Sequence, residues 1–256
     1  MSEPGTALVT GASAGIGAAL AGEFADHGHD VVLVARREER LRRLADELER
    51  RGVTATPIAM DLDAATAAMD LHEAVTDRGL DIDILVNNVG VGTYGPFADS
   101  DIDAERTQLR LNVVLPVELT RLFLDEFQGD GKVLNVGSMA GMAPGPGLST
   151  YYASKAYVNS FTEAIAEELR GEVDVTLVCP GPVDTDFADR AGMGESSVGS
   201  VSSNTPENVA EAAYTGLMAG ETVVVPSRAM RVVDLLHRVV PRPVVRRVSK
   251  WVNSGR

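Results

Sequence analysis

Apolar residues recur along the chain in short runs of strand length that alternate with longer helical patterns. Strands are expected at 6–11, 30–35, 53–60, 83–88, 132–138, 173–180 and 221–226. Helical patterns lie between them at 15–28, 37–52, 66–79, 104–128, 150–170 and 206–219. Several strands, such as DVVLVA at 30–35, contain Val and Leu without polar alternation, which is typical of parallel strands covered on both faces. The pattern predicts an α/β fold with a doubly wound, parallel, seven-stranded sheet and helices on both faces.

Two segments near the C-terminus depart from this alternation. Residues 187–205 are rich in Gly and Ser and can bury little apolar area, so we expect a mobile loop that serves as a lid. Residues 228–256 carry eight Lys and Arg against one Asp, and Val recurs there at helical spacing. We therefore expect one α/β domain over 1–227 and a basic tail over 228–256 that forms two short amphipathic helices, with Pro241 and Pro243 between them. The tail could pack on the acidic body or on a second subunit, or it could lie on an anionic membrane.

Composition narrows the possible functions. The chain of 256 residues has a formal charge of −14 at pH 7, which argues against a nucleic-acid partner, because such binding needs a basic surface. No apolar run reaches the length of about 18 residues that a membrane-spanning helix needs, and the N-terminus lacks the pattern of a secretory signal. A single cysteine, Cys179, suits a reducing compartment, so we expect a cytoplasmic protein. The four histidines have no metal-ligand spacing, and no metal site is predicted.

The stretch TGASAGIG at 10–17 joins the first expected strand to the first helix. Gly11 permits a tight turn, Gly15 allows close approach of the backbone to a pyrophosphate, and Gly17 lets the helix pack on the strand. The N-terminus of the helix then faces the phosphates. The stretch therefore predicts a dinucleotide-binding loop.

Further motifs follow in order. They are NNVG at 87–90, Asn112 in LRLNVVLP, Ser138 in NVGSMAG, YYASK at 151–155 and PGPVDT at 180–185. Together with TGASAGIG, this set resembles the short-chain dehydrogenase/reductase family in its single-domain branch. The resemblance implies a Rossmann-type, NADP-binding catalytic domain over 1–227. It also implies an oxidoreductase that interconverts a ketone or aldehyde and an alcohol, and assembly as a homodimer or homotetramer.

Two adjacent tyrosines precede a lysine in STYYASKAYVNS at 149–160. Because residues three and four apart share a helix face, both Tyr151 and Tyr152 could reach Lys155. An ammonium this close lowers the pKa of a phenol towards working pH and makes it a general acid or base. The resemblance selects Tyr151, because the family's tyrosine stands four residues before its lysine. Tyr152 is then expected to be a packing or substrate-side residue.

The resemblance also implies roles for the other catalytic residues. Tyr151 would donate a proton to the carbonyl oxygen as hydride arrives from the nicotinamide, and Lys155 would also bond the nicotinamide ribose. Ser138 would hydrogen-bond the substrate oxygen, although it could simply cap the end of a strand. Asn112 would hold a water in the proton relay to Lys155, although it could also be a surface residue of its helix.

The residues that select between NAD and NADP are expected where the second strand ends, in VLVARREER. NAD-binding members usually place a carboxylate there, whereas this chain has Ala35 followed by Arg36 and Arg37. Two guanidinium groups suit a 2′-phosphate, so NADP(H) is predicted in preference to NAD. Arg36 is the stronger candidate, since Arg37 could simply begin an exposed helix. Ala14 departs from the pattern, because many NADP-using relatives carry a basic residue at that position.

The resemblance assigns further cofactor contacts by position. They are Ser13 and Ile16 in the glycine loop, Asp61 and Leu62 after the third strand, Asn88 and Gly90 after the fourth, and Pro180, Gly181, Val183 and Thr185 after the sixth. Val89 stands where the family pattern has alanine, which adds bulk beside the adenine ribose.

The substrate depends on the loops at 91–98, 139–149 and 187–205. Apolar residues there favour an uncharged, apolar or lipid-like small-molecule carbonyl compound or alcohol. The alternative function is a catalytically silent NADP-binding sensor or scaffold. The presence of both Tyr151 and Lys155 argues for the enzyme.

Overall fold

A computed structural model describes residues 4–127, 130–193, 204–227, 229–233 and 240–253. Within these residues, seven strands form one parallel sheet in the order β3-β2-β1-β4-β5-β6-β7. The strands are β1 (Thr6–Thr10), β2 (Asp30–Ala35), β3 (Ala55–Ala59), β4 (Ile84–Asn87), β5 (Lys132–Val136), β6 (Asp174–Val178) and β7 (Val223–Val224). The chain begins inside the sheet, builds outward to β3 and returns to continue from β4. This order confirms the doubly wound Rossmann-type fold.

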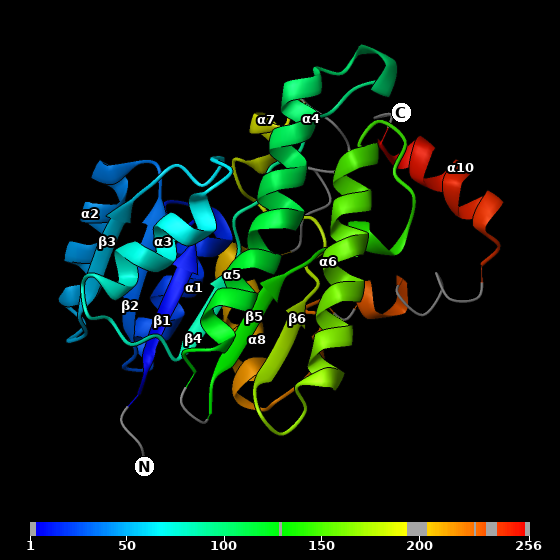
Figure 1. Ribbon diagram of the computed structural model, residues 1–256. Coiled ribbons are helices and arrows are strands. Elements are labelled where there is room, and N and C mark those ends of the chain that lie inside the picture. The colour runs from blue at the N-terminus through cyan, green and yellow to red at the C-terminus, as the bar shows by residue number, and fades with distance from the viewer. Residues whose placement is uncertain (1–3, 128–129, 194–203, 228, 234–239, 254–256) are drawn as a thin grey trace.

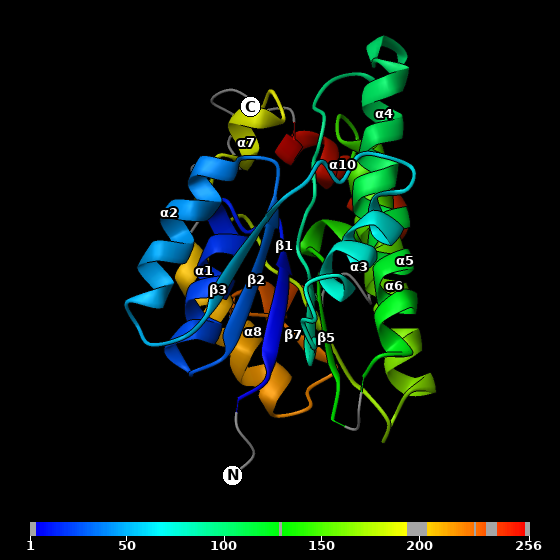
Figure 2. The same ribbon diagram turned by 60° about the vertical axis from the view of Figure 1, so that its left-hand side comes forward.

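Helices cover both faces of the sheet (Figures 1 and 2). One face carries α1 (Gly15–Asp26), α2 (Glu38–Glu49) and α8 (Pro206–Met218), and the other carries α3 (Ala67–Thr76), α4 (Ile102–Leu109), α5 (Leu115–Leu124) and α6 (Ser149–Glu168). Each layer has its own apolar core, with Phe24 of α1 fully buried in one and Phe123 of α5 in the other. Full burial of such a side chain contributes about 2 kcal/mol, so the two layers hold the sheet firmly between them.

The helix predicted over 104–128 is interrupted in the structure. A π-helical turn, η2 (Arg110–Val114), separates α4 from α5. Pro116 lies in the first turn of α5 and has no N–H to donate to the carbonyl of Asn112, four residues earlier. Such a break in the helical hydrogen-bond ladder is where single π turns occur, and they are frequent at functional sites. Asn112 therefore lies in an irregular turn and not within a regular helix.

A chain of buried polar side chains ties α6 to the sheet. Asn87 Nδ2 on β4 donates to Asn135 Oδ1 on β5 at 2.9 Å, and Asn135 Nδ2 donates to Thr162 Oγ1 on α6 at 3.0 Å. All three residues are buried. Because an unpaired buried polar group costs about 1–3 kcal/mol, sliding of α6 along the sheet is disfavoured. These hydrogen bonds thus fix the position of Tyr151 and Lys155, both on α6, relative to the carboxyl ends of the strands.

Above the carboxyl ends of the strands lie α7 (Phe187–Arg190) and α10 (Arg242–Asn253) (Figure 2). The predicted lid at 187–205 thus begins as a short helix, and its residues 194–203 lie outside the described part. The second amphipathic helix expected in the tail is α10. Of the first, residues 229–233 are helical and 234–239 lie outside the described residues. No helix in the described ranges has the length and apolar character needed to cross a bilayer.

Candidate active site

A cleft of about 680 Å³ opens at the carboxyl edge of the sheet. Its walls come from the segments that follow β1 through β6, the position at which doubly wound folds bind their ligands. Every residue predicted from the sequence to touch the cofactor lines this cleft, and so does Ser138. Asn112 does not; it lines a small cavity immediately behind Lys155.

The glycine loop has the backbone that a phosphate site requires. Gly11 and Gly15 have φ values of 70° and 56°, a region that favours glycine. A Cβ on Gly17 would lie 2.4 Å from the carbonyl oxygen of Gly11, so only glycine fits where α1 meets β1. The N-cap residue of α1, Ala14, makes no side-chain capping bond, and the first turn contains no acidic residue. The helix therefore presents N–H groups and positive potential to the cleft, which fits a pyrophosphate.

Arginines gather at the end of β2. Arg37 lies at the N-cap of α2, yet its guanidinium turns back and donates from Nε and Nη2 to Ser13 Oγ at 3.2 and 2.8 Å. Arg36 is exposed and lines the cleft, as does Arg190 of α7. Burial and the neighbouring cations Arg40 and Arg190 lower the pKa of Arg37. This concentration of positive charge suits a 2′-phosphate. The sequence did not predict that Arg190 would lie here, because it is far from Arg36 and Arg37 along the chain.

The two adjacent tyrosines have different partners. Tyr151 lines the cleft and hydrogen-bonds the Ser138 side chain. Tyr152 also lines the cleft, but its hydroxyl donates to Oδ1 of Asn253 on α10 at 3.1 Å. The rings are 6.3 Å apart and nearly perpendicular. The structure thus places Tyr151 and Tyr152 in different surroundings, a difference that their spacing from Lys155 in the sequence could not reveal.

The pKa values at this site differ from the sequence-based expectation. Burial raises the pKa of Tyr151 to about 12, against a lowering effect of its bond with Ser138. Burial likewise lowers the pKa of Lys155 to about 8. The lowering of the Tyr151 pKa that was expected from Lys155 is absent here, because burial dominates and Lys155 is not among the groups that shift this phenol. Tyr151 is held as the neutral phenol at neutral pH, the form that donates a proton.

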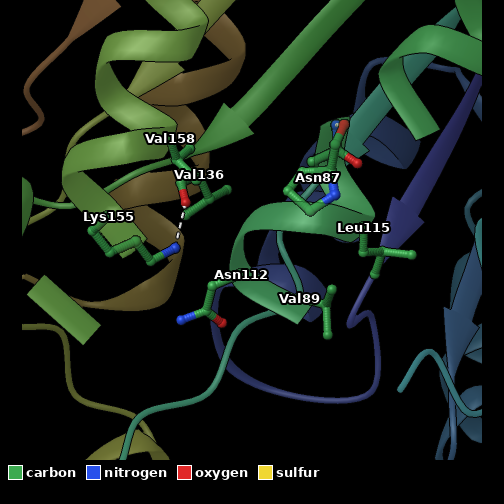
Figure 3. Close-up of a pocket in the computed structure, with 8 residues that line it drawn as sticks. Asn87, Val89, Asn112, Leu115, Val136, Lys155 and Val158 are labelled. Atoms are coloured by element: carbon green, nitrogen blue, oxygen red, sulfur yellow. Dashed lines mark hydrogen bonds between the residues drawn. The ribbon is translucent and has the colours of Figure 1, made fainter. Parts of the chain in front are cut away.

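Lys155 and Asn112 both line a small cavity behind the cleft (Figure 3). Lys155 is 6% exposed, and its Nζ donates to the carbonyl of Val136 at 2.7 Å. Asn112 is 2% exposed, so the alternative of a surface asparagine is wrong. Its amide donates to Val91 O at 2.9 Å and to Ser154 Oγ at 3.0 Å, and its Oδ1 accepts from Val91 N at 2.9 Å. These bonds join η2 to α6 and to the loop after β4.

A cavity of about 10 Å³ separates the two groups, with Asn87 on its wall (Figure 3). Asn87 Oδ1 is buried and has no hydrogen-bond partner among the residues that the structure describes. A space of this size is close to the smallest that can hold one water, and its lining is polar on the side of Lys155 and Asn112. The geometry thus provides a small polar compartment directly behind the ammonium group.

Ser138 is held by its neighbours. Its Oγ accepts from Ala140 N at 3.0 Å at the start of the 3₁₀ helix η3 (Met139–Met142), so Ser138 caps this short helix and not the end of a strand. Asn159 of α6 donates from Nδ2 to Ser138 O at 2.9 Å and accepts from Ser138 N at 3.3 Å. Ser138 therefore combines a structural cap with the bond to Tyr151.

The part of the cleft around Tyr151 and Phe187, called the substrate half below, is apolar. The part lined by the glycine loop and the arginines is called the cofactor half. Phe187 packs on Tyr151 with ring centroids 5.1 Å apart, and Leu148 and Met193 form a buried cluster beside them. Helix α10 adds Val248, Ser249 and Val252, and the helical segment 229–233 adds Met230 and Val233. The tail was predicted to be amphipathic, but no local pattern predicted that it would form a wall of the cleft. Within the described residues, no group of three His, Cys, Asp or Glu side chains could hold a metal ion.

Comparison with known proteins identifies relatives of this chain. Residues 5–195 match the family model for short chain dehydrogenases. A curated short chain dehydrogenase from Pseudocercospora fijiensis is 37% identical over 187 residues, which is 71% of this chain and 60% of that protein. The chain thus matches less than two thirds of that relative's length.

Solved structures show the same architecture over most of the chain. A short-chain dehydrogenase from Sphingobium yanoikuyae, in complex with NADPH, superposes with a TM-score of 0.80 at 31% identity and covers 93% of this chain and 97% of its own. A bulky-bulky ketone specific alcohol dehydrogenase from Comamonas testosteroni gives 0.76 at 29% identity, with 93% of each chain covered. A member from Burkholderia phymatum, in complex with NAD, gives 0.82 at 24% identity over 92% of this chain and 94% of its own, which shows the shared fold.

Proposed function

Because this chain belongs to the short-chain dehydrogenase family of oxidoreductases, we propose that it reduces a ketone or aldehyde to an alcohol with NADPH and catalyses the reverse oxidation. The observation that carries the proposal is that Tyr151, a neutral phenol, and Ser138 line the same cleft as the glycine loop. A proton donor and a dinucleotide-sized site thus share one cavity. The bound cofactor would supply the hydride.

The residues around the carbonyl would act on its oxygen. Ser138 would hydrogen-bond that oxygen and stabilise the negative charge that develops on it. Tyr151 would donate its phenolic proton to the same oxygen. Lys155 would bond the nicotinamide ribose and return a proton to Tyr151, and its pKa of about 8 keeps most of it charged at neutral pH. Asn112 and the cavity behind Lys155 would hold the water that resupplies Lys155.

NADP(H) is proposed as the cofactor in preference to NAD. Arg36, Arg37 and Arg190 line the cleft where the adenosine ribose would lie, and no carboxylate follows β2 directly. Gly11, Gly15 and Gly17, with the uncapped N-terminus of α1, fit the pyrophosphate. The Sphingobium relative with NADPH is consistent with this choice.

The substrate is proposed to be an uncharged carbonyl compound with an apolar body. The substrate half of the cleft presents aromatic, Met, Leu and Val side chains, and the Comamonas relative is specific for bulky ketones. Cytoplasmic location, assembly as a homodimer or homotetramer, and membrane contact of 228–256 remain predictions. Val244 and Trp251 of α10 are 47% and 65% exposed, so an apolar strip is present for either of the last two.

The test is a screen of aldehydes and ketones for NADPH consumption, with variants at two tyrosines. Tyr151→Phe should lower kcat by about 10²–10⁴-fold, the usual contribution of a general acid, while NADPH binding persists. Tyr157→Phe is the matched control, because Tyr157 is a half-exposed residue on the same helix outside the cleft, and it should behave as wild type. Full turnover by Tyr151→Phe would refute the assignment, and a protein that binds NADPH but reduces nothing would support the sensor alternative.

A further inference from the structure

The C-terminal helix α10 forms the outer wall of the substrate half of the cleft. Val248, Ser249 and Val252 face the same cavity as Tyr151 and Tyr152. Figures 1 and 2 show α10 beside the N-terminal end of α6, which carries both tyrosines. Unlike the loops that directly follow strands, α10 begins at Arg242, far along the chain from Val224, where β7 ends. Its placement must therefore come from its own contacts.

Those contacts converge on Asn253, the last residue of α10. Asn253 is 1% exposed, although it lies at the end of a surface helix. Its Oδ1 accepts from the Tyr152 hydroxyl at 3.1 Å, and its Nδ2 donates to Pro146 O at 3.0 Å. Its backbone carbonyl, one of those that a helix end leaves without an intrahelical donor, accepts from the Tyr94 hydroxyl at 2.8 Å. Asn253 thus forms hydrogen bonds through both polar atoms of its side-chain amide and through its main-chain carbonyl.

The three partners come from three separate segments that frame the substrate half. Tyr94 lies in the loop after β4, Pro146 in the loop after η3, and Tyr152 on α6. The first two segments are also joined by Gly95 N donating to Gly147 O at 2.9 Å. Asn253 therefore closes a ring of segments around the place where the body of a substrate would lie.

We propose that Asn253 is a specificity-determining positioning residue that latches α10 across the cleft, so that Val248 and Val252 bind the apolar body of a bulky carbonyl substrate. The inference rests on the proposed carbonyl reduction. A small ketone held at Tyr151 and Ser138 has no atoms that reach α10, whereas an extended one packs on it. The latch should therefore affect KM for extended substrates and leave the reaction at the carbonyl unchanged.

The kinetic test compares cyclohexanone with 4-cyclohexylcyclohexanone, which has the same reacting group and a larger apolar body. Asn253→Leu, close in size but without the amide, should raise KM for the larger ketone about tenfold, while kcat and KM for cyclohexanone stay within about twofold. Asn253→Gln, which retains the amide, should recover part of the loss. Val244→Ala is the control, because Val244 is on α10, exposed and outside the cleft. Parallel changes with both ketones, or no change with either, would overturn the proposal.

A second measurement tests the latch without catalysis. Trp251 is the only tryptophan of the chain and lies on α10, so its fluorescence anisotropy reports how firmly the helix is held. Asn253→Leu should lower the anisotropy, and so should Tyr94→Phe/Tyr152→Phe, which removes both hydroxyl donors and keeps the rings. Unchanged anisotropy in both variants would overturn the latch. A wild-type protein that reduces no carbonyl compound would instead refute the proposed function, and the anisotropy would still decide the latch.

Discussion

The two halves of the cleft are built by different means. The cofactor half consists of short segments that directly follow strands of the sheet, and its backbone shape depends on glycines such as Gly11 and Gly15. The substrate half consists of side chains from α7, α10 and two loops, held by contacts between residues far apart in sequence, such as Tyr152 and Asn253. Local motifs thus shape the proposed cofactor site, whereas contacts between residues far apart in the sequence shape the proposed substrate site.

The largest effect is expected from a methyl group added to the cofactor half. In Gly17→Ala the new Cβ would meet backbone at 2.4 Å, which cannot move aside cheaply, so a loss of about 3 kcal/mol in unfolding free energy and weaker NADPH binding are expected. Gly22→Ala on the same helix is the control. Its Cβ would meet only the end of the Arg51 side chain at 3.5 Å, and it should stabilise the protein by about 0.5–1 kcal/mol. Equal melting temperatures for the two variants would contradict the close-packing argument.

The next effect concerns cofactor choice at the end of β2. Arg36→Leu/Arg37→Leu should raise KM for NADPH by about 10- to 100-fold, because charge-assisted bonds to a 2′-phosphate are lost, and should leave KM for NADH nearly unchanged. Steady-state kinetics with both cofactors measures the ratio. Arg42→Leu, an exposed arginine of α2 that does not line the cleft, provides the control. A similar rise for NADH and NADPH would show that these arginines do not read the phosphate.

The pH dependence of reduction should follow Lys155. Its pKa of about 8 in the folded protein is below the ordinary value of 10.5, so above about pH 8 the ammonium is lost and kcat/KM should fall by about tenfold per pH unit. Over the same range the unfolded chain binds more protons at this residue, so its contribution to stability rises with pH from about 8 to 10.5. Thermal unfolding at each pH therefore separates the two effects. A profile that is flat to pH 10 would contradict the role of Lys155.

The smallest effect is expected at adjacent valines of α10. Val245 is buried and Val244 is 47% exposed, so Val245→Ala should cost about 1 kcal/mol and Val244→Ala less than about 0.5 kcal/mol. Denaturant unfolding measures both. The predicted membrane contact is tested at the same exposed strip by comparing how much wild-type and Trp251→Ala protein sediments with anionic vesicles. Equal costs for the two valines would mean that α10 does not pack on the body as described.

The fold and the cofactor half could be predicted because their signals are local. Strand-length apolar runs, the glycine spacing and the arginines after β2 each lie within a few residues of the element that they define. The substrate half could not be predicted, since nothing near Asn253 in the sequence indicates partners 101 and 159 residues away. The π turn at Asn112 and the raised pKa of Tyr151 were also missed, because both depend on the packed environment.

The buried chain from Asn87 through Asn135 to Thr162 has a consequence for divergence. It ties α6, which carries Tyr151 and Lys155, to the sheet through contacts that do not involve α10. Mutations in the tail should therefore be able to accumulate, or a foreign tail to be grafted, without displacing Tyr151, the proposed proton donor. Proteins built on this plan could acquire new substrates by exchanging their last helix while inheriting the chemistry intact.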